Sequence, residues 1–297
     1  MADNVLGIIG GTGIGETFVK RSGAERIEID TPFGRPSDAI LRVNVDGLAC
    51  LFVSRHGEGH RLSPSQVPYR ANIYALKTLG ATHVIATGAT GSLREEIGPG
   101  DLVVCDQVID KTFGRPSTFF DDGIAAHVEF AEPFCQTMRK ALLAAASSIE
   151  AKVHDGGAYV CMEGPQFSTR AESQLHRNWG GDLIGMTCMP EAKLAREAEM
   201  CYALIALPTD YDSWRPRQAD EDKTALLAEI IANMRRAGAA ALALIERTIG
   251  QLADSDLPPC ACHDALELAI WTDRKYVQPA IVEKLKPLIG RYFPDGA

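Results

Sequence analysis

The sequence predicts an α/β protein in which helices cover both faces of a central sheet. Two patterns support this prediction. Short apolar runs that are typical of strands alternate along the chain with segments of helical spacing. Several of the strand-like runs are apolar on both faces, as expected for a sheet buried between two layers of helices. With 297 residues, the chain is long enough to build a large core without disulfide or metal staples.

Apolar runs of strand length define the predicted sheet. The first run ends in glycines, and Asp46-Gly47 between the second and third is a strong signal for a hairpin turn. The strands are predicted over residues 5–10, 41–45, 48–53, 83–87, 102–105, 158–162, 183–186 and 202–207.

Helical spacing of apolar residues, often rich in Ala and Leu, marks the segments between and after these strands. Gly80 closes the first helix. The helices are predicted over residues 68–79, 132–151, 170–179, 190–200, 222–252 and 279–289. Pro and Gly are evenly spread up to about residue 252. We therefore predict one domain over 1–252 and a C-terminal helical extension over 253–297 that packs on it.

The charge balance limits the classes of partner. Thirty Lys and Arg against 39 Asp and Glu give a formal net charge of −9. Nucleic acids and anionic membranes are therefore poor candidate partners, because binding them requires concentrated positive charge. The chain has no apolar run long enough to span a bilayer and no basic N-terminal signal segment. Most of the eight cysteines lie in apolar runs, which predicts buried thiols in a reducing cytoplasm.

A glycine-rich turn follows the first strand. Backbone amides in the run Gly10 to Gly15 can bind a phosphate. A nicotinamide-binding enzyme is one alternative, but the spacing does not match the dinucleotide fingerprint, and no clear helix follows. A tight turn without a ligand is the other alternative.

Two further loops follow strands and are suited to an anion. Arg55 can form a bidentate pair with a phosphate, and the neighbouring His56 can add a hydrogen bond. A solvated loop is the alternative. A metal site at His56 and His60 is not predicted, because the intervening glycines oppose a helix that would align the two rings. The small-residue turn at 87–92 could hold a second side of the same anion.

Two later segments carry groups suited to a planar base. Phe167 can stack on a base, or can be a core residue ahead of a helix that Thr169 and Glu172 cap. Asp210 and Asp212 follow an apolar strand, at the sheet edge where α/β proteins bind ligands. A partly buried Asp there can keep its proton and act as an acid, whereas an ordinary Asx turn is the alternative.

Taken together, several motifs resemble the trimeric purine nucleoside phosphorylase superfamily, in its branch that cleaves S-methyl-5′-thioadenosine. The resemblance covers roughly residues 5–250 and implies a single-domain, phosphorylase-type fold with a twisted mixed sheet. The motifs are Gly-Gly-Thr-Gly at 10–13, Asp-Thr-Pro-Phe-Gly at 30–34, Arg-His-Gly at 55–57, Gly-Ser-Leu-Arg-Glu-Glu at 91–96, Glu-Gly-Pro at 163–165 with Phe-Ser at 167–168, Met-Thr at 186–187, and Thr-Asp-Tyr-Asp at 209–212.

The resemblance implies phosphorolysis, in which phosphate is a co-substrate and nucleophile and no cofactor or metal is used. Asp210 would donate a proton to purine N7, with a pKa raised by burial and by Asp212. An acceptor carboxylate at this position favours adenine over a 6-oxopurine. The implied phosphate ligands are Thr12, Gly13, Arg55, His56, Ala89 and Thr187. The implied nucleoside contacts are Phe167, Ser168, Met186, Asp210, Asp212, His60, Leu227 and, from a neighbouring subunit, His127.

The resemblance also implies a cytoplasmic homotrimer with sites at its subunit interfaces. A 6-oxopurine or broader nucleoside phosphorylase remains the alternative enzyme, and a nucleoside-binding protein without turnover is the alternative outside enzymes. Cys260 and Cys262 resemble a Cys-x-Cys pair of some microbial members that can form a redox-active disulfide, and Cys135 and Cys201 lie where such members have a bridge. Here we expect free thiols.

Overall fold

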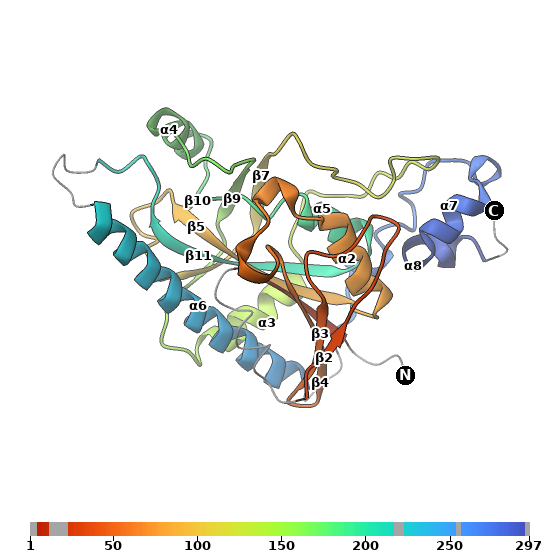
Figure 1. Ribbon diagram of the computed structural model, residues 1–297, viewed down its shortest axis with the longest axis horizontal. Coiled ribbons are helices and arrows are strands. Elements are labelled where there is room, and N and C mark those ends of the chain that lie inside the picture. Colours follow the sequence, from red (N-terminus) through yellow and green to blue (C-terminus); the bar gives the residue numbers. More distant parts are fainter. Residues whose placement is uncertain (1–4, 12–22, 217–222, 254–256, 295–297) are drawn as a thin grey trace.

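The computed structural model describes residues 5–11, 23–216, 223–253 and 257–294. Within these residues, a mixed sheet of eleven strands forms the centre, with helices on both of its faces (Figure 1). The strands are β1 Val5–Gly10, β2 Glu25–Ile27, β3 Ile40–Val45, β4 Leu48–Ser54, β5 His83–Ser92, β6 Leu102–Val104, β7 Gln107–Lys111, β8 Val153–Asp155, β9 Ala158–Met162, β10 Leu183–Gly185 and β11 Cys201–Tyr211.

The sheet follows the order β2-β3-β4-β1-β5-β10-β9-β7, and β11 adds a branch beside β5. Strand β1 runs parallel to both β4 and β5, whereas β3 and β4 form the predicted antiparallel hairpin across Asp46-Gly47. Strand β5 is longer than predicted. Strand β11 pairs with it in parallel along its whole length, whereas on the other side its first half pairs with β1 and its end pairs antiparallel with β10. The ends of β5 and β11 therefore lie side by side, and β10 pairs with the same end of β5.

The helices divide the core into two layers. The α-helices are α2 Tyr69–Thr78, α3 Gln136–Ala146, α4 Arg170–Asn178, α5 Glu191–Glu197, α6 Lys223–Ala253, α7 Pro279–Lys284 and α8 Lys286–Ile289. Helices α3 and α6 pack on one face and α2 and α5 on the other (Figure 1). Strand β1 contributes Ile8 to the first core and Ile9 to the second. The prediction of strands buried on both faces is therefore confirmed.

Several helix boundaries differ from the prediction. The helix expected over 132–151 is confined to α3, because Cys135 is still extended and the helix ends before Ser147-Ser148. The helix expected over 279–289 is broken at Leu285, since Pro287 lacks the amide that would continue the first helix. The short strands β2, β7 and β8 were not predicted, because their sequences are polar or only three residues long.

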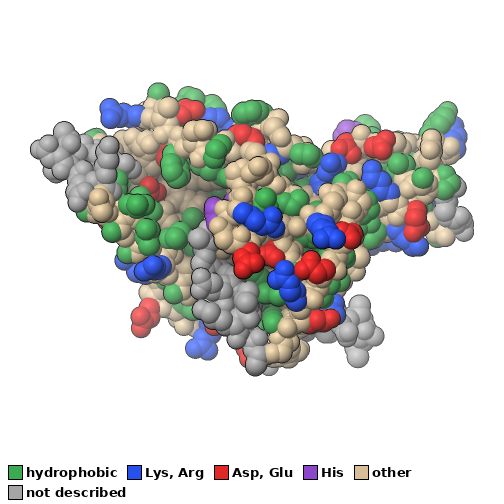
Figure 2. Space-filling view, viewed as in Figure 1, with side chains coloured by type: hydrophobic (Ala, Val, Ile, Leu, Met, Phe, Trp, Pro, Cys, Tyr) green, Lys and Arg blue, Asp and Glu red, His purple; other side chains and the backbone are tan. Residues whose placement is uncertain are grey.

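Residues of the C-terminal extension join the same core as α2 and α5. They are Leu266, Ala269, Val277, Val282, Leu285, Leu288, Ile289 and Phe293. In the space-filling view, basic and acidic side chains are interspersed over the visible face (Figure 2). Within the described part of the chain, no helix is long and apolar enough to span a membrane.

Candidate active site

A β-bulge near the end of β11 brings the two candidate carboxylates to strand β5. Pro208 pairs with Thr90 and Asp210 with Gly91, so Thr209 is the extra residue. The Thr209 hydroxyl donates to the Thr90 carbonyl, and the Asn233 amide of α6 donates to the Thr209 carbonyl at 2.9 Å. The bulge is therefore held from both sides.

Gly91 leaves the room that these carboxylates need. A Cβ atom placed on Gly91 would lie 3.1 Å from the Asp212 Cβ atom and 3.5 Å from Asp210 Oδ1. A side chain at this position would crowd both aspartates. The Asp212 amide also donates to the Ser92 carbonyl at 3.0 Å, which continues the attachment to β5.

Asp212 is poised to accept a hydrogen bond from a ligand. Its side chain is buried, and its Oδ2 atom has no hydrogen-bond partner among the described residues. Buried polar oxygens are nearly always paired in folded proteins, because an unpaired one costs about 1–3 kcal/mol. This oxygen is therefore suited to an N–H group of a bound base.

The loop after β9 approaches the same region through Ser168. Ser168 is buried, and its carbonyl accepts a hydrogen bond from the Ser213 hydroxyl at 2.8 Å, one residue beyond Asp212. Thr169 and Glu172 form the predicted capping box at the start of α4. Phe167 is 83% exposed in the single chain, so its apolar ring is available for stacking.

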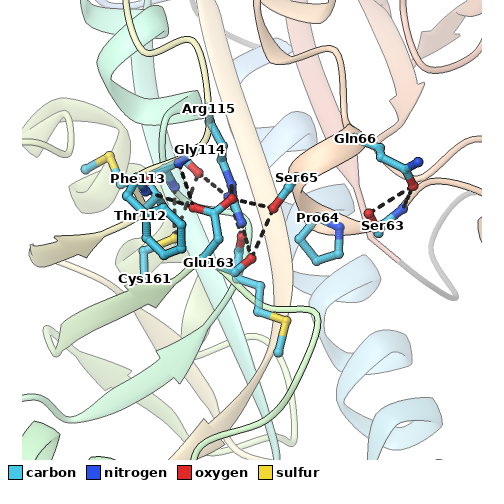
Figure 3. A network of polar contacts seen from close by, with 12 residues as sticks. Ser63, Pro64, Ser65, Gln66, Thr112, Phe113, Gly114, Arg115, Cys161 and Glu163 are labelled. Atoms are coloured by element: carbon cyan, nitrogen blue, oxygen red, sulfur yellow. Dashed lines mark hydrogen bonds and ion pairs between the residues drawn. The ribbon is translucent and has the colours of Figure 1, made fainter.

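An ion pair between buried Arg115 and partly buried Glu163, which the sequence analysis missed, positions this loop. Glu163 lies between Ser65 and Arg115, and both side chains donate to its carboxylate (Figure 3). The backbone amides of Phe113 and Gly114 donate to its other oxygen. Burial raises the pKa of Glu163, but these hydrogen bonds and the Arg115 charge outweigh it and lower the pKa to about 2.

Arg115 links three segments of the site. Its guanidinium donates to the carbonyls of Glu163, Met186 and Met189 at 2.5, 2.6 and 2.6 Å. It thereby joins the loop that carries Phe167 to the segment that carries Met186. Arg115 lies in an irregular stretch outside every motif, so only the fold reveals this role.

The proposed phosphate ligands converge in part. Thr12 and Gly13 lie outside the described residues. The Gly11 amide, just before them, donates to the Thr87 hydroxyl of β5 at 3.3 Å. A Cβ atom on Gly88 would lie 3.5 Å from the Thr187 hydroxyl, and Ala89 is exposed beside it. Gly11, the middle of β5 and Thr187 are thus neighbours.

Arg55 is close to this group but is already paired. It is fully buried, and its Nε and Nη2 atoms donate to the two Glu191 carboxylate oxygens at 2.8 and 2.7 Å. Its Nη1 atom donates to the Thr87 carbonyl at 2.7 Å. Burial lowers the pKa of Arg55, but the Glu191 charge outweighs this effect, and the net shift is upward. Arg55 therefore supports the loop structurally, whatever it contributes to phosphate binding.

His56 is held in one tautomer. Its Nδ1 atom lies 2.8 Å from the Leu62 carbonyl, which can only accept, so Nδ1 carries a proton. Its ring stacks on His60 with 4.2 Å between the ring centroids. Burial, followed by the charges of Arg55 and His60, lowers the pKa of His56 to about 4. At neutral pH its Nε2 atom is then an acceptor, which suits a protonated phosphate oxygen.

Because of His56, we expect the free energy of unfolding to decrease as the pH is lowered from about 6.5 to about 4. An unfolded His titrates near pH 6.5, so the unfolded chain binds a proton in this window that the folded chain does not. The stabilisation is complete above pH 6.5 and is lost toward pH 4. Urea unfolding of His56→Gln in phosphate-free buffer is expected to show a shallower slope of the unfolding free energy over this range. An unchanged slope would show that other groups dominate.

Of the remaining candidates, Leu227 and His127 are not brought together within one chain. Leu227 is exposed near the start of α6, at one end of the molecule (Figure 1). His127 packs against Trp271 of the C-terminal extension, which lies toward the other end, and its amide donates to the Ala269 carbonyl. His60 stacks on His56.

Comparison with known proteins identifies the class that this fold and site define. The family model of the phosphorylase superfamily matches residues 5–250. The chain therefore belongs to the phosphorylase superfamily. Relatives that match it over nearly their full length are S-methyl-5′-thioadenosine phosphorylases. That of Geobacter sulfurreducens is 46% identical, covering 98% of this chain and 99% of the relative, and that of Chloroflexus aurantiacus is 44% identical, covering 99% and 100%.

Solved structures agree in fold. A methylthioadenosine phosphorylase from an antarctic soil metagenomic library matches with a TM-score of 0.88 and 41% identity, over 97% of this chain and 99% of that chain. A mutant adenosine/methylthioadenosine phosphorylase from Schistosoma mansoni, in complex with methylthioadenosine, matches with a TM-score of 0.77 and 38% identity, over 86% and 93%. The resemblance read from the sequence motifs is thereby confirmed, as is the predicted fold class.

Proposed function

We propose that the chain catalyses phosphorolysis of S-methyl-5′-thioadenosine to adenine and 5-methylthioribose 1-phosphate. The carboxylate pair at the end of β11 carries this proposal. Gly91 accommodates Asp210 and Asp212, and Asp212 retains a buried oxygen for an N–H donor. The names of the full-length relatives support the same substrate.

The proposed reaction needs no protein nucleophile. A phosphate oxygen attacks C1′ of the ribose, and the bond from C1′ to N9 breaks with its electron pair leaving on the purine. Asp210 donates a proton to N7, so adenine departs as a neutral base. Holding phosphate in line with C1′ replaces a bimolecular encounter with a nearly unimolecular step. Ala89, Thr187, His56 and the glycine-rich turn would form the phosphate side, with Met186 against the ribose.

Substrate comparison tests the proposal directly. With phosphate present, the enzyme is expected to release adenine from S-methyl-5′-thioadenosine far faster than it releases hypoxanthine from inosine. A base site built from acceptor carboxylates leaves groups unpaired against a 6-oxopurine, and such mismatches cost several orders of magnitude. Equal or faster turnover of inosine would favour a 6-oxopurine phosphorylase. Adenine release that did not depend on phosphate would exclude phosphorolysis.

We further propose that the active form is a cytoplasmic homotrimer in which a neighbouring subunit completes the 5′ side of the site. Within one chain, His127 packs on the extension rather than near the start of α6. Three head-to-tail contacts close a ring, as a heterologous interface must to avoid growing into a filament.

Sedimentation at micromolar concentration is expected to give about three times the chain mass of 32.1 kDa. His127→Ala is expected to raise the KM for methylthioadenosine and to leave the KM for phosphate nearly unchanged. A fully active monomer would refute the shared site.

A further inference from the structure

Four cysteine side chains from three separate parts of the chain converge beside the C-terminal extension. Cys135 precedes α3, Cys201 begins β11, and Cys260 and Cys262 lie at the start of the extension. All four Sγ atoms lie within 4.8 Å of one another. The Cys135 and Cys260 sulfurs are 3.4 Å apart, and those of Cys260 and Cys262 are 3.5 Å apart.

We propose that these four cysteines bind one zinc ion as a structural tetrathiolate site that fastens the extension to the domain. Zinc is tetrahedral in such sites, with bonds to sulfur of about 2.3 Å, which places the sulfurs about 3.8 Å apart. Four mutually adjacent sulfurs meet this requirement with only small adjustments. The sequence did not predict the site, because its three parts are far apart along the chain and no Cys-x-x-Cys pair is present.

The arrangement fits a metal better than a pair of disulfides. A disulfide joins two sulfurs at about 2.05 Å, so two disulfides require only that sulfurs approach in pairs. A tetrahedral ion requires all four sulfurs to be mutual neighbours, and here all four lie within 4.8 Å of one another. All eight cysteines lie in the described part of the chain, and none forms a disulfide there.

The histidines nearby are better placed to support the site than to bind the metal. His83 and His263 also approach Cys201. The His83 Nε2 atom lies 3.1 Å from the Pro258 carbonyl and therefore donates, so Nδ1 accepts from the Thr82 hydroxyl at 2.9 Å. Both nitrogens of His83 are thus occupied. The His263 Nε2 atom lies 3.4 Å from the Cys201 sulfur and can donate to it, which offsets the negative charge of four thiolates.

The surroundings also favour a stable, closed site. Cys135, Cys201 and Cys262 are buried in the core between α3, α6 and the sheet, while Cys260 is partly exposed. Zinc binding forms four Zn–S bonds without any redox change, and each thiol that binds releases its proton to solvent.

The site would hold the extension against the part of the domain where His127 lies. Ala126 pairs with Ile270 in an antiparallel bridge, and His127 packs on Trp271. The zinc ion would attach the start of this same extension to α3 and β11. The cysteine geometry indicates zinc whether or not the chain catalyses the proposed reaction.

Metal analysis of the full chain tests the proposal. Protein purified under reducing conditions without strong chelators is expected to contain about one zinc per chain by elemental mass spectrometry. In a Cys260→Ser/Cys262→Ser double variant, the zinc content per chain is expected to be at least tenfold lower. The matched control is Cys50→Ser, which changes a buried cysteine of the same core outside the cluster.

Cobalt gives an independent measurement on the unmodified chain. After zinc is removed, added Co²⁺ is expected to produce the thiolate-to-cobalt absorption bands of a tetrahedral sulfur site, and the double variant is expected to lack them. Titration of the unmodified zinc protein with a mercurial reagent should release zinc as thiols react. This measurement keeps the proposal testable if the variants fail to fold.

Three outcomes would overturn the proposal. The first is a chain that contains less than one-tenth of a zinc per molecule and gives no cobalt thiolate bands. The second is zinc that persists at full content in a folded double variant, which would place the metal elsewhere. The third is mass analysis without reductant that shows disulfides among these four cysteines in freshly purified protein.

Discussion

Replacing Asp210 with Asn is expected to lower kcat/KM for S-methyl-5′-thioadenosine by about 10²-fold or more, because loss of a general acid has effects of this size. The Asn side chain has nearly the same shape, so it should fit beside Gly91, where a Cβ atom would lie 3.5 Å from Asp210 Oδ1. It has no carboxyl proton to give to N7. The departing adenine would then carry negative charge in the transition state. Steady-state adenine release at saturating phosphate measures the loss.

A surface aspartate provides the matched control. Asp46 has a φ of 53° in the turn between β3 and β4, a conformation that Asn also tolerates, and it lies in no part of the site. Asp46→Asn is expected to leave the kinetics unchanged. The Asp210 variant is also expected to raise turnover of inosine relative to methylthioadenosine. Unchanged turnover of methylthioadenosine by Asp210→Asn would refute the assignment of Asp210 as the acid.

Removing Glu191 is expected to destabilise the fold by about 3–5 kcal/mol, because the variant leaves the Arg55 charge buried without its partner. Both side chains of this ion pair are 1% exposed. The Tyr202 hydroxyl also donates to the Glu191 carboxylate at 2.8 Å, so Glu191→Ala leaves two buried groups unpaired. Urea unfolding at constant pH measures the effect.

An exposed carboxylate serves as the control for this measurement. Glu28 pairs with Arg26 on the surface, and its side chain is 67% exposed. Surface pairs of this kind contribute about 0–1 kcal/mol, so Glu28→Ala is expected to change stability very little. If Glu191→Ala costs no more than Glu28→Ala, the buried pair does not hold the core in the way we infer.

The same pair decides how the role of Arg55 can be tested. As an implied phosphate ligand, Arg55 is expected to affect phosphate binding most, so Arg55→Ala should raise the KM for phosphate far more than the KM for nucleoside. The single variant also breaks the buried pair, so its kinetics combine two effects. An Arg55→Met/Glu191→Leu double variant replaces the pair by apolar groups of similar size, and is expected to regain much of the stability. A raised phosphate KM in that folded variant would identify Arg55 as a phosphate ligand.

Local signals in the sequence were sufficient for most of the sheet and for the family. The strand predicted over 158–162 matches β9, and the Asp46-Gly47 turn joins β3 to β4. Both are set by neighbouring residues, because apolar runs and positive-φ turns depend on local conformation. The predicted helix ends were less accurate where a boundary depended on a single residue. Pro287 broke the last predicted helix although the apolar spacing continued through it.

The candidate site shows the same division. The sequence singled out Asp210, Asp212, Arg55 and His56 from their motifs, but it did not reveal Glu191 or Arg115. Each of these two residues acts through a partner distant in the chain: Glu191 with Arg55, and Arg115 with Glu163. No local pattern encodes such a pair, because the contact exists only once separate elements have packed.

The sequence by itself determined the class of protein, most of the strands and the chemical groups that phosphorolysis would use. Only the tertiary structure decided that a bulge at Thr209 places two carboxylates over Gly91, that Arg55 is paired with Glu191, and that four distant cysteines meet. The physical reason is the distance along the chain over which each kind of interaction acts. Backbone preferences and apolar periodicity act over a few residues, whereas ion pairs, buried unpaired oxygens and metal geometry depend on distances between side chains that only the folded chain brings together.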